Sequence, residues 1–207
     1  CGARRTPTST STMQVLEGEE ELDREETRFG IRTLSIDVAH GVRINGQTVK
    51  LRGACIHHDN GILGAATLPD AEERHIRQLK EAGFNAIRSS HHPAGRALLD
   101  ACDRYGMLVM DELSDVWNVR KNPYDYALYF EQDWKPTIQK MVAKDYNHPS
   151  VILYCVGNEI SEAGSESGAE TNRRLCNTFR ELDPTRYTTN ALNGLMACLL
   201  YTSDAAD

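Results

Sequence analysis

Four apolar runs of the sequence each end in polar residues, most of them ionisable. These residues are His57, His58 and Asp59 after the first run, Arg88, Ser90 and His91 after the second, Asp111 and Glu112 after the third, and Asn158 and Glu159 after the fourth. Histidine and carboxylate side chains are the common groups for proton transfer. If the runs are parallel strands, their carboxyl ends meet at one edge, and a reaction site would lie there.

Glu159 is the candidate for general acid chemistry. It follows the run at 151–156 and the dipeptide Gly157-Asn158. Partial burial at a barrel mouth would raise the pKa of the Glu159 carboxyl and let it hold a proton near neutral pH. The amide of the neighbouring Asn158 could hydrogen-bond a hydroxyl group of a substrate. Taken alone, an Asn-Glu pair is more often a helix cap or a solvated loop.

Strand and helix patterns alternate from residue 51 onward. We expect strands at 51–56, 84–88, 107–110, 151–156 and 187–191. We expect helices between them, the first with Asp70 as N-cap and Glu73 completing a capping box, and the third with Pro136 in its first turn. This order predicts an α/β fold with a parallel sheet. The absence of a Gly-x-Gly-x-x-Gly motif and of a P-loop favours a barrel over a nucleotide-binding open sheet.

The number of repeats sets the extent of that barrel. The sequence supplies about four βα units and a fifth strand. A complete barrel takes roughly 250 residues. The fold class is therefore a partial (β/α)8 TIM barrel.

The segment before the barrel has a different composition. Residues 1–12 are rich in Ser and Thr and are expected to be disordered, and residues 13–28 are acidic and are expected to form a solvated loop. Residues 29–38 alternate like a strand, and Asn45-Gly46 predicts a hairpin turn.

Bulk properties narrow the class of protein. The 207 residues carry a net charge of -7, which argues against a nucleic-acid partner. No run of 18 apolar residues is present, so no membrane span is expected. Four of the six cysteines, Cys55, Cys102, Cys155 and Cys176, lie in apolar runs, and we expect buried free thiols in a reducing, cytoplasmic compartment.

Short motifs recur in order along the chain. They are Phe29-Gly30-Ile31-Arg32, Asn45-Gly46 with Leu51-Arg52-Gly53, His57-His58-Asp59, the run from Phe84 to Pro93, Asp103-Arg104-Tyr105-Gly106, Asp111-Glu112, Asn147-His148-Pro149-Ser150, Gly157-Asn158-Glu159 and Leu182-Asp183-Pro184-Thr185-Arg186. With these motifs in this order, residues 29–196 resemble glycoside hydrolase family 2, the β-galactosidase and β-glucuronidase family.

The resemblance implies roles for single residues. Glu159 falls on the acid/base of a retaining mechanism, whose nucleophile is a glutamate on a later strand that this sequence does not contain. The residues expected to contact the substrate are Asn158, His57, His91, Asp59, Arg88, Glu112 and Trp117. Arg88 is expected to pair with a carboxylate, either Glu159 or the nucleophile. Trp117 either stacks on a sugar ring or packs beneath its loop.

No metal site and no cofactor are expected. The spacing of the histidines and Asp59 fits no zinc pattern. Some members of the family carry an acidic residue and a histidine of a magnesium site after the third strand. This chain instead reads Leu113-Ser114-Asp115-Val116-Trp117-Asn118 there.

These inferences give a domain organisation and a function. We expect residues 13–38 to be the edge of an immunoglobulin-like β-sandwich, residues 39–196 the first half of a catalytic TIM barrel, and residues 197–207 a tail of unclear origin. The expected function is hydrolysis of terminal β-galactosides, with a β-linked saccharide as the partner. The alternatives are a β-glucuronidase, and a truncated chain with no activity of its own. The complete protein could be a homo-oligomer.

Overall fold

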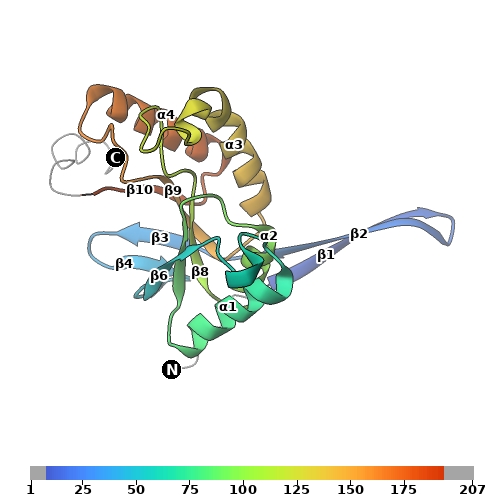
Figure 1. The fold of residues 1–207 in the computed structure, drawn as a ribbon. Coiled ribbons are helices and arrows are strands. Elements are labelled where there is room, and N and C mark those ends of the chain that lie inside the picture. Colours follow the sequence, from blue (N-terminus) through green and yellow to red (C-terminus); the bar gives the residue numbers. More distant parts are fainter. Residues whose placement is uncertain (1–7, 194–207) are drawn as a thin grey trace.

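The computed structural model describes residues 8–193, and its centre is a five-stranded parallel sheet (Figure 1). The strands are β6 (Gly53–His57), β7 (Ala86–Ser90), β8 (Leu108–Glu112), β9 (Val151–Asn158) and β10 (Tyr187–Ala191). They lie in chain order, and each pairs in parallel with the next. The predicted α/β fold of a partial barrel is confirmed.

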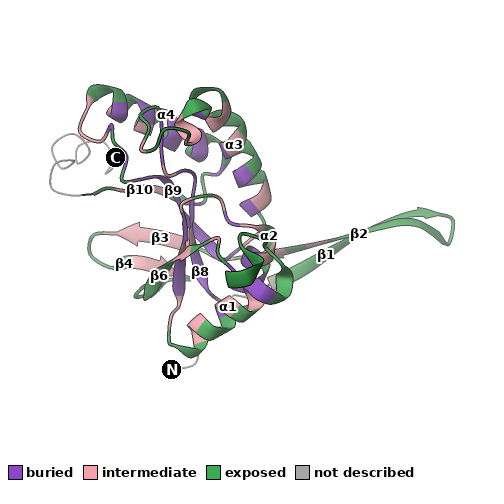
Figure 2. Cartoon of the chain, viewed as in Figure 1, coloured by how far each residue is buried: buried purple, intermediate pink, exposed green. Residues whose placement is uncertain are grey.

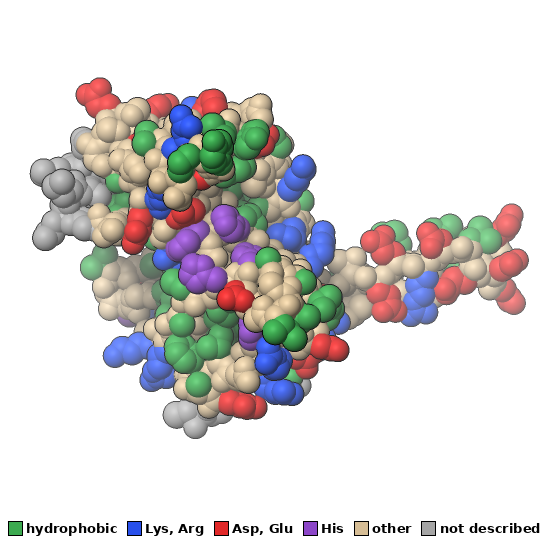
Figure 3. Space-filling model, viewed as in Figure 1, with side chains coloured by type: hydrophobic (Ala, Val, Ile, Leu, Met, Phe, Trp, Pro, Cys, Tyr) green, Lys and Arg blue, Asp and Glu red, His purple; other side chains and the backbone are tan. Residues whose placement is uncertain are grey.

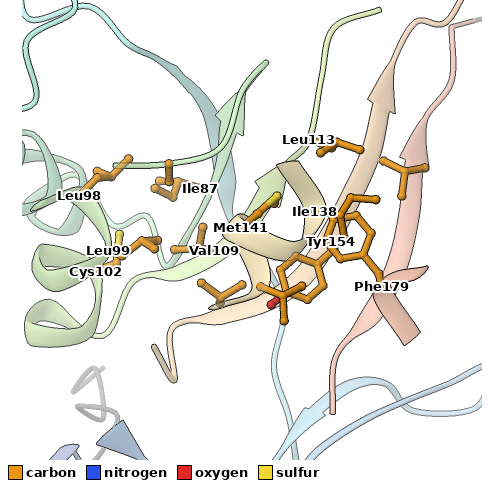
Figure 4. Packing of buried hydrophobic residues seen from close by; sticks show 14 of the residues in the cluster. Ile87, Leu98, Leu99, Cys102, Val109, Leu113, Ile138, Met141, Tyr154 and Phe179 are labelled. Atoms are coloured by element: carbon orange, nitrogen blue, oxygen red, sulfur yellow. The ribbon is translucent and has the colours of Figure 1, made fainter. Parts of the chain in front are cut away.

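A helix connects each strand to the next. The helices are α1 (Pro69–Glu81), α2 (Arg96–Tyr105), α3 (Phe130–Asp145) and α4 (Glu166–Leu182), with short 3-10 turns at Gly61–Leu63 and Tyr126–Leu128. Their apolar stripes pack on one face of the sheet, where Leu99 and Ile138 are fully buried beside Val109 and Tyr154 (Figures 2 and 4). Each such aliphatic side chain contributes roughly 1.5–3 kcal/mol.

Two helix starts differ from the prediction. Helix α1 begins at Pro69 and its N-cap is Leu68, which makes no side-chain capping bond. Asp70 is therefore inside the helix and no capping box forms, because the fixed φ of a proline suits the first helical position. Helix α3 begins at Phe130, a buried anchor, so Pro136 lies in the helix interior and not in the first turn.

A small antiparallel sheet packs under the amino ends of the barrel strands. It consists of β3 (Leu34–Asp37), β4 (Gly41–Ile44) and β5 (Gln47–Thr48). Both turn residues between β4 and β5 have positive φ, Asn45 at 51° and Gly46 at 73°, which confirms the Asn-Gly hairpin. The boundary predicted at residue 38 falls between β3 and β4, which pair with each other, so it would divide this sheet.

The acidic amino-terminal segment forms a long ribbon. Strands β1 (Thr8–Glu17) and β2 (Glu20–Gly30) pair antiparallel and project from the body (Figure 1). Disorder was expected for 1–12 and a loop for 13–28, and both expectations are wrong for residues 8–28. The β-branched threonines and the turn at Gly18, with φ 65°, favour a hairpin. The acidic composition had indicated a solvated loop instead. Residues 1–7 and the expected tail at 197–207 lie outside the described residues, and the β-sandwich assignment stays a prediction.

The cysteines follow the prediction with one exception. Cys102, Cys155 and Cys176 are buried free thiols, and burial raises the pKa of the Cys155 thiol to about 12. Cys55 is free but exposed, because it lies two residues before His57 and so shares the open face of β6 with it. Within residues 8–193, no helix is long and apolar enough to span a membrane.

Candidate active site

The carboxyl ends of the parallel strands bring the predicted side chains together. The rings of His57, at the end of β6, and His91, just after β7, meet edge to face with centroids 5.1 Å apart. Histidine side chains gather in a hollow at the centre of this face, between the helices above and below (Figure 3). Asp59 is exposed beside them, and its carboxylate accepts a hydrogen bond from the Gly61 amide at 2.9 Å.

A buried ion-pair network links β7 and β8. The Glu112 carboxylate is fully buried and accepts hydrogen bonds from Arg88 Nε at 2.5 Å and from His91 Nδ1 at 2.6 Å. Burial alone would lower the pKa of the Arg88 guanidinium, but its hydrogen bond to Glu112 and the charge of Glu112 outweigh burial and raise it. The expected pairing of Arg88 with Glu159 or the nucleophile is corrected by this geometry, because Glu112 lies on the neighbouring strand.

Asp111 secures the loop that carries His91. Its Oδ1 accepts hydrogen bonds from Ser89 Oγ at 2.6 Å and from the Ala94 amide at 2.8 Å. Its Oδ2 lies 3.3 Å from the ammonium of Lys144. Asp111 therefore fixes both ends of the loop after β7, at Ser89 and at Ala94.

The side chain of Asn158 is held on both sides. Its Oδ1 accepts a hydrogen bond from Arg88 Nη2 at 2.6 Å, and its Nδ2 donates to Asp115 Oδ1 at 2.8 Å. Asp115 also binds the ammonium of Lys121 at 2.8 Å. Burial opposes ionisation of Asp115, but the hydrogen bonds from Lys121 and Asn158 outweigh it and lower the pKa of this carboxyl.

Asp115 and Lys121 were missed by sequence reasoning. They lie in the irregular segment between β8 and α3, where no periodic pattern marks contacts. Glu162 was missed for the same reason. Its Oε1 accepts hydrogen bonds from the amides of Asn118 and Val119, both at 2.8 Å, and so joins this segment to the loop after Glu159.

Glu159 lies where β9 ends, with an unusual backbone conformation. Its φ is 44°, in the left-handed region, and its amide donates a hydrogen bond to the Ala191 carbonyl of β10 at 2.7 Å. Its side chain is exposed. Within residues 8–193 the expected partial burial of this carboxylate is therefore not found.

Trp117 does not face the hollow. It is fully buried in the core, and its Nε1 donates a hydrogen bond to the Val156 carbonyl at 2.9 Å. It packs against Gly157, where an added Cβ would lie 3.0 Å from the indole nitrogen. Stacking of Trp117 on a sugar is therefore ruled out in this arrangement, and the packing alternative holds. The aromatic residue of this segment that is most open to solvent is Tyr124.

The carboxylates around Asn158 do not suit a magnesium ion. Arg88 neutralises Glu112 and Lys121 neutralises Asp115. Among the described residues, the group with metal-ligand spacing is Asp100, Asp103 and His148. Asp103 in that group is already bonded to His148 Nδ1 at 2.7 Å and to the Ser150 amide at 3.0 Å, at the opposite end of the sheet.

The parallel sheet is backed by helices and carries ionisable side chains at its carboxyl edge. These features are those of a (β/α)8-barrel enzyme domain, of which this chain forms a part. Residues 37–202 match the family described as glycosyl hydrolases family 2, TIM barrel domain. The chain belongs to this family.

Individual relatives support the assignment. The chain is similar to β-galactosidase BoGH2A of Bacteroides ovatus, with 45% identity over 78% of this chain and 19% of that protein. It is also similar to a putative β-glucuronidase of Formosa agariphila, with 34% identity over 86% of this chain and 16% of that protein. A solved family 2 member from Bacteroides cellulosilyticus superimposes with a TM-score of 0.86 at 44% identity, over 91% of this chain and 24% of that one. The chain thus spans about a fifth of the length of these curated relatives.

Proposed function

We propose that the complete protein carrying this chain is a retaining glycoside hydrolase that acts on terminal β-galactosides, with Glu159 as its general acid/base. The observation that supports this proposal is the position of Glu159. An exposed carboxylate stands at the end of β9, next to a fixed Asn158 and at the edge where His57 and His91 meet. A proton donor needs such access to the substrate together with a fixed backbone.

The mechanism uses two carboxylates. Glu159 gives its proton to the glycosidic oxygen while a nucleophilic carboxylate attacks the anomeric carbon, and Glu159 then takes a proton from the water that releases the sugar. Glu112 is bound by Arg88 and His91, and Asp115 by Lys121, so neither is free to attack. We infer, from the resemblance to the family, that the nucleophile is a glutamate on a later strand, and we expect the 207-residue chain by itself to show no glycosidase activity.

A neutral sugar fits the described part of the site better than a uronic acid. A sugar carboxylate calls for an unpaired cation or amide group. Two cations at this edge are already paired, Arg88 with Glu112 and Lys121 with Asp115. The 45% identical relative is a β-galactosidase. β-Glucuronidases among the other relatives make that activity the second candidate.

The test measures the complete enzyme on two substrates. We expect turnover of nitrophenyl β-galactoside with a kcat/KM at least about tenfold above that for the β-glucuronide. Glu159→Gln should lower hydrolysis by about 10²- to 10⁴-fold, the usual contribution of general acid/base catalysis. Glu181→Gln, an exposed glutamate near the end of α4, is the matched control and should stay at the wild-type rate. Preference for the glucuronide would replace the galactosidase assignment, and wild-type rates in Glu159→Gln would remove Glu159 from the mechanism.

A further inference from the structure

The peptide group between Asn158 and Glu159 is held from two directions. Its carbonyl oxygen, that of Asn158, accepts a hydrogen bond from Lys121 Nζ at 2.8 Å. Its N–H, that of Glu159, donates to the Ala191 carbonyl at 2.7 Å. Lys121 lies in the segment after β8 and Ala191 ends β10. Two neighbours of β9 in the barrel thus fix the plane of one peptide group.

The backbone at Glu159 needs this support. A φ of 44° is unfavourable for a residue with a Cβ, and such a conformation persists only where surrounding contacts determine it. The conformation decides where the Glu159 side chain leaves the end of β9. Contacts that hold the peptide group therefore also set the position of the carboxyl group.

Lys121 is itself well anchored. Its ammonium pairs with Asp115, and Asp115 Oδ1 also accepts the hydrogen bond from Asn158 Nδ2. Its backbone amide donates to Asp125 Oδ2 at 2.7 Å. The Lys121 side chain is 22% exposed, so water competes little for the ammonium. Lys121 thus contacts the backbone of Asn158 directly and its side chain through Asp115.

We infer that Lys121 is a positioning residue for the acid/base, a role that rests on the proposed function of Glu159. Its ammonium keeps the Asn158–Glu159 peptide group in the orientation that places the Glu159 carboxyl at the leaving oxygen. Without it, the backbone can relax and proton transfer is impaired. The loss grows with the need of the leaving group for a proton, because a strongly activated phenolate leaves without protonation.

The experiment compares three variants of the complete enzyme on two substrates. Lys121→Met keeps the apolar stem and removes the charge, whereas Lys121→Arg keeps a cation. Lys140→Met, on an exposed position of α3, is the control for loss of a lysine. The substrates are phenyl β-galactoside, a poor leaving group, and 2,4-dinitrophenyl β-galactoside, a good one. A displacement of about 1 Å in a catalytic group costs on the order of 10²-fold.

We expect Lys121→Met to lower kcat/KM by about 10- to 100-fold for the phenyl galactoside and by less than about threefold for the dinitrophenyl galactoside. Lys121→Arg should recover part of the loss, and Lys140→Met should equal the wild type. Equal losses on both substrates, or no loss, would overturn the inference and leave the proposed function intact.

A wild-type enzyme that hydrolyses neither galactoside would instead contradict the proposed function. The crystal structure of the Lys121→Met protein then decides the inference. A rotated Asn158–Glu159 peptide group, with a changed φ at Glu159, supports it, and an unchanged peptide group overturns it.

Discussion

Replacement of Arg186 by methionine should unfold the barrel at a clearly lower temperature. Arg186 closes the motif Asp183-Pro184-Thr185-Arg186, is 6% exposed and forms an ion pair with Asp183 through Nη1 at 2.5 Å. Its other nitrogens donate to the main-chain carbonyls of Val151, Asp145, Tyr146 and His148 at 2.9–3.2 Å. One guanidinium therefore ties the turn before β10 to the start of β9.

The magnitude follows from what the substitution leaves behind. Asp183 is fully buried, and removal of one partner from a buried ion pair costs about 3–5 kcal/mol. The freed carbonyls add to this cost, although those of the turn at 145–148 can regain water. With roughly 2–4 °C of melting temperature for each kcal/mol in a domain of this size, we expect a decrease of about 6–20 °C.

The assay is thermal unfolding of the complete protein, followed by calorimetry. Arg180→Met is the matched control, because Arg180 is exposed on α4 and its described contact is with Asn177. Surface substitutions of this kind stay within about 0.5 kcal/mol. A decrease below about 2 °C for Arg186→Met would refute the reasoning.

The pH dependence of the same variant adds a second check. Burial opposes ionisation of Asp183, but hydrogen bonds from Thr185 and the charge of Arg186 outweigh it and lower the pKa of this carboxyl. The stability from this lowered pKa is present above the unfolded pKa of about 3.9 and is lost as the pH falls through the folded value. The difference between Arg186→Met and wild type should therefore be largest near neutral pH and shrink below about pH 4.

Two further predictions concern buried carboxylates. Glu112→Gln removes the charge that pairs with Arg88 and His91, and kcat/KM on an aryl β-galactoside should fall by at least about 10²-fold, whereas a value within threefold of wild type would contradict the role of this network. Burial and the nearby charge of Asp111 raise the pKa of Asp145, although the ammonium of Lys144 acts in the opposite direction, so ionisation of Asp145 should destabilise the fold as the pH rises above the unfolded pKa of about 3.9. Asp145→Asn should remove that part of the decline, and a melting temperature whose pH dependence is the same in both proteins would contradict the assignment.

The framework of the barrel was predictable because its signals are local and repetitive. Apolar strands, helices closed by glycine at Gly106 or by Asp183-Pro184, and the Asn45-Gly46 turn each depend on residues next to one another. The ends of parallel strands share an edge, so the meeting of His57 and His91 followed from the topology. The ordered motifs then indicated the family.

The contacts between side chains were less predictable because they join segments far apart in the chain. Arg88 pairs with Glu112, 24 residues away, and sequence reasoning had two other carboxylates as candidates. Trp117 lies in a segment without periodicity, so its burial against Val156 had no pattern to indicate it. The ribbon β1–β2 was hidden because acidic residues outweighed the strand preference of threonine.

Azide rescue of Glu159→Ala in the complete enzyme tests the central claim most directly. With 2,4-dinitrophenyl β-galactoside the sugar still reaches the nucleophile, because this leaving group needs no proton, but water then attacks slowly without a general base. Azide needs no base. We predict that turnover falls by about 10²-fold or more in the variant, and that azide restores at least about tenfold and yields β-galactosyl azide. Wild-type turnover in Glu159→Ala, or recovery without a glycosyl azide product, would contradict the assignment of Glu159 as the acid/base.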